Sequence, residues 1–263
     1  MKKDIHNKLI EFGSIHLENW LVVEIVGNEL KVEEFLQGQV TSDISLLSDK
    51  CSQLSSVCDH KGRVIADFII TKINKTYKFV LDSTLKDILI NELEPFSKFY
   101  KVQFKKTNEH VIGVISKRSN SKEPFLSNKF FEISIYAKEN LDKFNNSINS
   151  SQWEVANKIL GNLYLKSSDT EKYRPLEINY DELRVSFDKG CYRGQEIVAR
   201  MKYLGVDRRK FCTFITEKNF ILHEDIKIAG EVIELDNNRI FNGIIKRDSL
   251  SDMQNLQGII DIY

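Results

Sequence analysis

Lys189-Gly190-Cys191-Tyr192-Arg193-Gly194-Gln195-Glu196 is the stretch of this sequence that constrains its fold most strongly. Residues 184–187 before it read as a short strand. The apolar positions after it share one helical face: Ile197, Val198, Met201 and Leu204. The stretch is therefore a glycine-framed loop between a strand and the N-terminus of a helix. The partial positive charge of that terminus, together with Lys189 and Arg193, favours the thiolate of Cys191 over the thiol.

Cys191 has two interpretations at this point. Gly190 and Gly194 let the backbone approach a ligand closely, which suits a loop that presents a working thiol. The same glycines suit a tight turn around a cysteine that packs as a small buried hydrophobe. The five histidines show no pairing with a cysteine that would identify a Cys–His catalytic pair. Core packing is the better interpretation for the other cysteines, which are Cys51, Cys58 and Cys212.

The overall charge is balanced, with 38 lysines plus arginines against 38 aspartates plus glutamates. Direct nucleic-acid binding is therefore not expected, because coating a polyanion needs a surplus of cations. Basic residues do gather between residues 189 and 210: Lys189, Arg193, Arg200, Lys202, Arg208, Arg209 and Lys210. This local patch attracts anions and keeps an RNA-binding module open as a weaker alternative.

The four cysteines are scattered and include no Cys-x-x-Cys pair. The sequence therefore predicts neither a disulfide framework nor a dedicated metal site. No apolar stretch approaches the ~20 residues that a membrane helix needs, and residues 1–13 hold no signal-peptide core. We expect a soluble protein of the reducing cytoplasm, without a membrane partner.

The chain divides into an α+β body, residues 1–205, and a small β-rich module, residues 206–263. In the body, a turn at residues 59–63 joins two strands of a β-meander, and Gly62 can supply a positive φ there. In the module, four strand patterns cover residues 211–216, 226–235, 239–246 and 258–263. Polar residues 236–238 mark a hairpin turn between two of them.

The stretch at residues 189–196 closely resembles the signature of the YgfZ family, the folate-binding relatives of the glycine-cleavage T-protein (aminomethyltransferase). Further segments agree with that family in the same order: residues 35–43 (Phe-Leu-Gln-Gly-Gln-Val-Thr-Ser-Asp), 59–63 (Asp-His-Lys-Gly-Arg), 175–177, 185–187, 197–200, 204–205 and 208–209. The eight-residue motif is specific, and the other segments support it.

The resemblance implies two interleaved ferredoxin-like lobes, closed into a ring by a C-terminal β-barrel, with a tetrahydrofolate or a derivative at the centre. It also implies a role in iron–sulfur cluster assembly or repair and, through an iron–sulfur tRNA methylthiotransferase, in tRNA modification. The folate-contacting tryptophans of the family fall on Trp20 and Trp153. A flat indole suits a pterin ring, and the basic segment with Arg193 and Arg200 suits the anionic glutamate tail. Without the resemblance, either tryptophan would read as a core or interface anchor.

The aminomethyltransferase branch usually carries two adjacent aspartates after the hairpin turn, where this sequence has Asp67 alone. The chain is also shorter than a typical T-protein, and that branch usually has no cysteine at the position of Cys191. We therefore expect a folate-binding factor for iron–sulfur enzymes, with Cys191 as a redox-active or cluster-contacting thiol, rather than a glycine-cleavage enzyme. A tetrahydrofolate-dependent one-carbon transferase, with Asp67 as acid or base, is the alternative.

Overall fold

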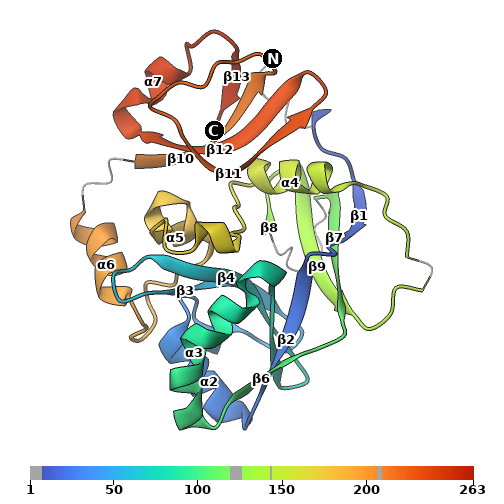
Figure 1. Ribbon diagram of the computed structural model, residues 1–263, viewed down its shortest axis with the longest axis vertical. Coiled ribbons are helices and arrows are strands. Elements are labelled where there is room, and N and C mark those ends of the chain that lie inside the picture. The colour runs from blue at the N-terminus through green and yellow to red at the C-terminus, as the bar shows by residue number, and fades with distance from the viewer. Residues whose placement is uncertain (1–7, 119–125, 143, 206–208) are drawn as a thin grey trace.

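The computed structural model describes residues 8–118, 126–142, 144–205 and 209–263. Three antiparallel sheets, with helices packed on and between them, make up this part of the chain (Figure 1). The α+β class expected from the sequence is confirmed. None of the described helices is both long and apolar enough to cross a membrane.

The first sheet has the strand order β3-β4-β5-β2-β6. Its elements are β2 (Trp20–Val26), α2 (Glu29–Gln39), β3 (Ser52–Cys58), β4 (Val64–Ile73), β5 (Thr76–Asp82), α3 (Lys86–Tyr100) and β6 (Gln103–Lys106). Phe68 and Phe79 face the core that α2 and α3 cover, whereas Ile69 and Val80 belong to a second core on the opposite face. Burial of both faces explains why β4 is almost continuously apolar.

The second sheet has the order β1-β7-β9-β8, and α4 packs against it. Its elements are β1 (Gly13–His16), β7 (His110–Lys117), β8 (Leu126–Ser127), β9 (Phe131–Lys138) and α4 (Ser150–Ile159). Because β1 pairs with β7 while β2 to β6 form the first sheet, the two sheets are interleaved along the chain. Asn149 and Gln152 form a capping box that fixes the start of α4.

The third sheet is the C-terminal module, in the order β11-β12-β10-β13. Its strands are β10 (Arg209–Glu217), β11 (Lys227–Leu235), β12 (Asn238–Lys246) and β13 (Ile259–Ile262), with α7 (Leu250–Met253) before the last. The four predicted strands are therefore present, but no closed barrel is found in residues 209–263. The edge strand β13 is short and its register with β10 shifts at Ile215 and Thr216, so β11 and β13 stay unpaired with each other. The predicted boundary at residue 206 lies outside the described residues.

Two helices lie between the first and third sheets, α5 (Tyr180–Leu183) and α6 (Gln195–Leu204) (Figure 1). The motif at residues 189–196 connects them, and its last two residues begin α6. The prediction of a strand at residues 184–187 is wrong. The backbone N–H groups of Arg184 and Val185 donate back to the carbonyl of Tyr180, so this segment closes α5 instead of pairing with a strand. Short 3-10 turns complete the chain at Ile44–Leu46, Ser83–Leu85, Ser167–Asp169, Pro175–Glu177 and Arg247–Ser249.

Candidate functional site

The motif loop is anchored by Lys189, whose side chain is 8% exposed. Its Nζ donates to the backbone carbonyls of Gln37 (2.8 Å), Val40 (2.7 Å) and Ser42 (2.9 Å) at the C-terminal end of α2. Burial lowers the pKa of Lys189 to about 8, while the nearby Asp43 favours the charged form. The three N–H groups of the ammonium therefore join the motif to residues 37–42, far away in the sequence.

Gly194 fixes the other end of the motif loop. Its φ is +80°, and a Cβ at this position would lie 2.4 Å from the carbonyl oxygen of Asp59. The turn that it meets is held by the Asp59 carboxylate, which accepts from the backbone N–H groups of Lys61 and Arg63. A glycine is therefore required at Gly194 both for its conformation and for close approach of the two loops.

Cys191 is exposed and carries a free thiol. The interpretation of Cys191 as a small buried hydrophobe is therefore wrong. A Cβ on the neighbouring Gly190 would meet nothing within 4 Å, so the loop is open to solvent at that residue as well. By contrast, Cys58 is buried and burial raises its thiol pKa to about 12. The loop thus presents one accessible sulfur on a rigidly anchored backbone.

The remaining motif residues support this loop. Tyr192 is buried, with the Lys189 ammonium 5.1 Å from its ring centroid. Arg193 forms an ion pair with Glu92 of α3 and lies over the Phe96 ring. Gln195 and Glu196 open α6, where Glu196 places a carboxylate in the first turn.

A separate pocket of about 180 Å³ lies where the first sheet, α4 and the third sheet meet, and we call it the Trp20 pocket. Its lining residues are Trp20, Asp82, Glu154, Lys158, Leu163, Tyr164, Leu165, Lys166, Ser168, Asp169, Gly230 and Glu231. The Trp20 and Tyr164 rings meet edge to face, with centroids 4.7 Å apart and planes at 88°. The pocket therefore combines an aromatic wall with charged groups, as small-molecule sites commonly do.

The charged groups of the Trp20 pocket differ in their surroundings. Lys166 and Glu231 form an exposed ion pair of 2.5 Å at its edge. Lys158 is 2% exposed, and its Nζ lies 3.4 Å from Oδ1 of Asn242. Burial raises the pKa of the Glu154 carboxyl and lowers the pKa of the Lys158 ammonium. Burial thus shifts both groups of this helix face toward their neutral forms.

Asp67 and Arg184 lie beneath the segment that lines the pocket, and both are almost fully buried. Oδ2 of Asp67 lies 3.2 Å from Nη2 of Arg184, and its Oδ1 accepts from the backbone N–H of Leu165 at 3.0 Å. The Arg184 guanidinium donates to Oδ1 of Asn162 (2.8 Å) and to the carbonyl of Leu163 (3.2 Å). Burial raises the pKa of Asp67 to about 6 in spite of the attraction of Arg184. The pair therefore holds residues 162–165 in place.

Comparison with known proteins decides the family. No family model matches the chain. An uncharacterized protein of Haemophilus influenzae is 31% identical over 224 residues, which cover 83% of this chain and 77% of that protein. The tRNA-modifying protein YgfZ of Klebsiella pneumoniae is 25% identical over 279 residues (93% and 83% covered), and that of Vibrio atlanticus is 25% identical over 228 residues (78% and 70%). The chain belongs to the YgfZ family.

Among solved structures, this YgfZ-family chain is similar to the glycine cleavage system aminomethyltransferase T of Bartonella henselae. The TM-score is 0.63 at 11% sequence identity, and the match covers 92% of this chain and 80% of the other. At this identity the likeness shows a shared fold.

The YgfZ motif and the Trp20 pocket are two distinct places in the structure. None of residues 189–196 lines the Trp20 pocket, so Cys191 does not open into it. Arg193 is held by Glu92, and Arg200 is an exposed residue of α6 outside the pocket lining. The structure therefore does not bring the two predicted tail-binding arginines to the pocket.

The two tryptophans have different roles. Trp20 lines the pocket, as predicted for a ligand contact. Trp153 is 2% exposed and packs on β7, where a Cβ on Gly113 would lie 2.7 Å from its indole ring. It packs into the second core, so it is a core residue and does not line the pocket.

Asp67 does not line the pocket either. Its carboxylate is used by Arg184 and by the backbone of Leu165, so a ligand in the pocket has no direct access to it. In this arrangement Asp67 positions Arg184 and the backbone of Leu165, and its role as an acid or base stays a prediction.

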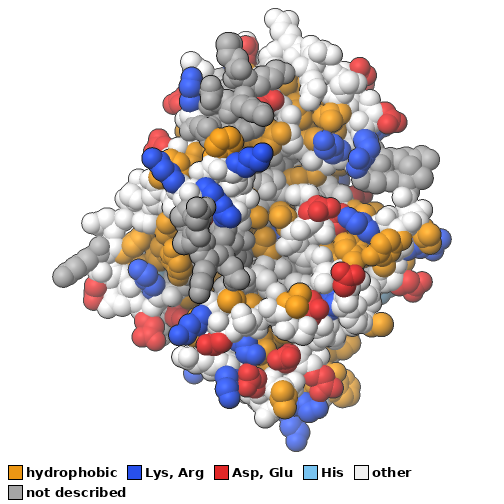
Figure 2. All heavy atoms as spheres, turned by 180° about the vertical axis from the view of Figure 1, so that it is seen from behind, with side chains coloured by type: hydrophobic (Ala, Val, Ile, Leu, Met, Phe, Trp, Pro, Cys, Tyr) orange, Lys and Arg blue, Asp and Glu red, His pale blue; other side chains and the backbone are white. Residues whose placement is uncertain are grey.

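Two of the basic residues after the motif form ion pairs with acidic side chains. Lys202 pairs with Asp181 at 2.9 Å, and Arg209 pairs with Glu177 at 2.8 Å. Arg208 lies outside the described residues. On the face of the molecule in Figure 2, Lys and Arg side chains stand among acidic and hydrophobic ones. On this face the charges of both signs are therefore mixed.

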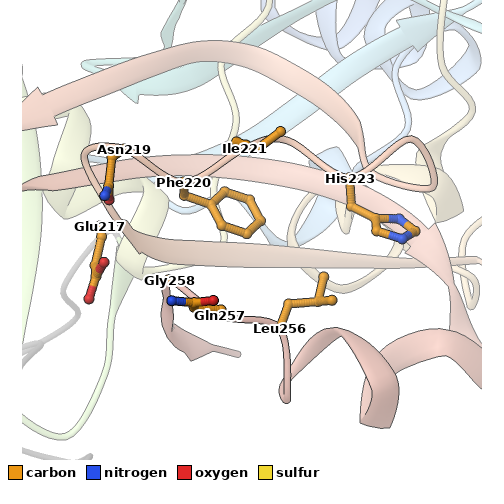
Figure 3. A pocket seen from close by; sticks show the side chains of 8 residues that line it. All are labelled: Glu217, Asn219, Phe220, Ile221, His223, Leu256, Gln257 and Gly258. Atoms are coloured by element: carbon orange, nitrogen blue, oxygen red, sulfur yellow. The ribbon is translucent and has the colours of Figure 1, made fainter.

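A second hollow lies in the C-terminal module, between the segment after β10 and the segment before β13 (Figure 3). Its lining includes Phe220, Ile221, His223 and Leu256. His223 accepts a hydrogen bond from the backbone N–H of Asp225 at 3.2 Å. Convergent charged groups like those of the Trp20 pocket are absent from its lining, so we do not assign it a ligand.

Of the residues that line the Trp20 pocket, sequence reasoning identified Trp20 alone; those it missed include Glu154, Lys158, Tyr164, Lys166 and Glu231. The spacing of Glu154 and Lys158 was a usable signal, because residues four apart share a helix face and these two flank the apolar face that carries Trp153. Glu231 carries no such signal, since its strand meets α4 only in the folded chain.

Proposed function

We propose that this protein binds a tetrahydrofolate in the Trp20 pocket and that it supports iron–sulfur cluster assembly or repair in the cytoplasm. Through iron–sulfur enzymes it would contribute to tRNA modification, including methylthiolation. The observation that carries the proposal is the pocket itself, where an aromatic wall meets the half-buried carboxylate of Glu154 and the buried ammonium of Lys158. Membership of a family whose relatives are named tRNA-modifying proteins supports the second part.

The pocket suits the pterin head of a folate. A volume of about 180 Å³ lies below the ~300–1,000 Å³ that encloses a drug-sized ligand, so it suits one ring system with the rest of the ligand outside. Trp20 and Tyr164 offer apolar contact to the ring. The carboxylate of Glu154 can accept from the ring N–H and amino groups. Of the two lysines in the lining, Lys166 is the exposed one, and it can pair with the anionic tail.

Three parts of the fold converge on this pocket. The first sheet supplies Trp20, α4 supplies Glu154 and Lys158, and β11 supplies Gly230. A ligand that contacts all of them would stabilise their arrangement by binding the native state alone.

Cys191 is assigned the role of a redox-active or cluster-contacting thiol. It is exposed, and its loop is anchored at both ends by Lys189 and Gly194. Within the described residues no group of three metal-binding side chains is present, so Cys191 would provide at most one protein ligand to a cluster carried by a partner enzyme.

Changing Cys191 to serine is expected to leave folding and tetrahydrofolate binding as in the wild type, because the thiol is exposed and lies outside the pocket. In a cell that lacks the protein, the variant should fail to restore iron–sulfur enzyme activity and the methylthio modification of tRNA. The measurements are calorimetric binding, an iron–sulfur enzyme assay and mass spectrometry of tRNA nucleosides. Cys51→Ser is the matched control and should complement fully. Full complementation by Cys191→Ser would remove the thiol from the proposed function.

A further inference from the structure

Glu154 and Lys158 attract each other electrostatically, yet neither forms an ion pair with a residue that the structure describes. Asp82 accepts from Thr84, Asp169 accepts from the backbone of Lys166, and Lys166 pairs with Glu231. Glu154 has neither a hydrogen bond nor an ion pair to any residue that the structure describes. Lys158 has a single side-chain hydrogen bond to the residues that the structure describes, the long one to Asn242.

This incomplete pairing of Lys158 is unusual because its side chain is 2% exposed. An ammonium has three N–H donors, and leaving donors without acceptors in a buried site is costly. Asn242 offers one carbonyl oxygen, and its amide is already committed to Thr213 at 2.9 Å. A ligand acceptor in the pocket would complete the hydrogen bonding of Lys158.

The two groups also stand side by side. They are four residues apart on α4, both line the pocket, and no ion pair joins them among the described residues. A carboxylate accepts hydrogen bonds and an ammonium donates them. Together they match a ligand edge on which N–H donors are followed by a carbonyl oxygen.

We propose that Glu154 and Lys158 make this pocket selective for a 2-amino-4-oxo pteridine ring over a 2,4-diamino one, with Lys158 as the residue that discriminates. This rests on the proposed function, folate binding at this pocket. Glu154 accepts from the 2-amino group, which both rings carry. Lys158 donates to the 4-oxo group, which the diamino ring replaces with a second amino donor, so that two donors would face each other.

The test compares folic acid with aminopterin, which differ in the ring edge at position 4 and carry the same tail. Dissociation constants are measured by calorimetry for the wild type, Lys158→Met and Lys158→Gln. The wild type should bind folic acid at least about tenfold more tightly, since one hydrogen bond to a charged donor contributes about 1.5–3 kcal/mol. Lys158→Met should abolish that preference while retaining aminopterin binding, and Lys158→Gln, which keeps an N–H donor, should restore part of it.

Lys31→Met is the matched control, because Lys31 is exposed, pairs with Glu34 and lies outside the pocket lining; it should keep the wild-type preference. Equal binding of the two ligands by the wild type overturns the inference even if Lys158→Met does not fold. An unchanged preference in a folded Lys158→Met protein overturns it as well. Binding of neither ligand, nor of tetrahydrofolate, by the wild type would reject the proposed function itself, and the inference with it.

Discussion

Replacing Arg184 with methionine is expected to lower the free energy of unfolding by about 3–5 kcal/mol, because it leaves a buried carboxylate without its cation. Arg184 is 1% exposed, and its guanidinium contacts Asp67, Asn162 and Leu163 beneath the pocket. Urea unfolding followed by circular dichroism measures the effect. Arg200→Met, a change at an exposed arginine, should alter the stability by no more than about 0.5 kcal/mol.

The double variant Asp67→Asn/Arg184→Met separates an ion pair from simple packing. Once the carboxylate is gone, the loss of Arg184 no longer strands a charge, so the double variant should be more stable than Arg184→Met alone. A double variant whose loss equals the sum of the two single losses would contradict the coupling of Asp67 and Arg184.

The destabilisation caused by Arg184→Met is expected to depend on pH through the carboxyl group of Asp67. Burial raises the pKa of Asp67 to about 6, above the ordinary value of 3.8. The stability that its protonated form contributes is therefore complete below about pH 4 and is lost as the pH rises through 6. Without Arg184 the pKa rises further and more stability is lost. The destabilisation by Arg184→Met should accordingly be larger at pH 7 than at pH 4.

Replacing Lys189 with methionine is expected to lower the free energy of unfolding by about 3 kcal/mol, because three buried or partly buried carbonyls lose their hydrogen-bond donor. These carbonyls belong to Gln37, Val40 and Ser42, so the loss is shared by two distant segments. Hydrogen exchange read by mass spectrometry should show faster exchange at residues 37–43 and 189–196 together.

The matched control for Lys189 is Lys202→Met on α6, where the lysine is exposed and pairs with Asp181. It should change the stability by about 0.5 kcal/mol and leave exchange at residues 37–43 unchanged. If Lys189→Met accelerates exchange in one of the two segments and leaves the other protected, Lys189 does not anchor the loop as described.

Local patterns predicted a good part of this fold. Apolar spacing after the motif predicted α6, and alternating residues predicted the four strands of the C-terminal module. The motif at residues 189–196 also indicated the family, which the comparisons confirm. These features depend on residues that are close together in the sequence, so they can be predicted from the sequence alone.

The candidate site was harder to predict because it is built by tertiary contacts. The sequence suggested that Trp20 and Trp153 share a role, but α4 turns Trp153 toward Gly113 and Glu154 toward the pocket. Residues 184–187 have the composition of a strand, yet the backbone bonds of Arg184 close α5. Which face of a helix meets which sheet is decided by packing that a single sequence does not specify.

Tetrahydrofolate binding to the wild type and to Trp20→Leu, measured by isothermal titration calorimetry, tests the central claim most directly. Loss of one aromatic face from the pocket should weaken binding by at least about tenfold, since stacking on an aromatic ring contributes about 1–3 kcal/mol. Phe99→Leu, at an exposed aromatic of α3, is the control and should bind as the wild type does. Tetrahydrofolate affinity that is the same in wild type and in a folded Trp20→Leu protein would contradict a folate site in this pocket.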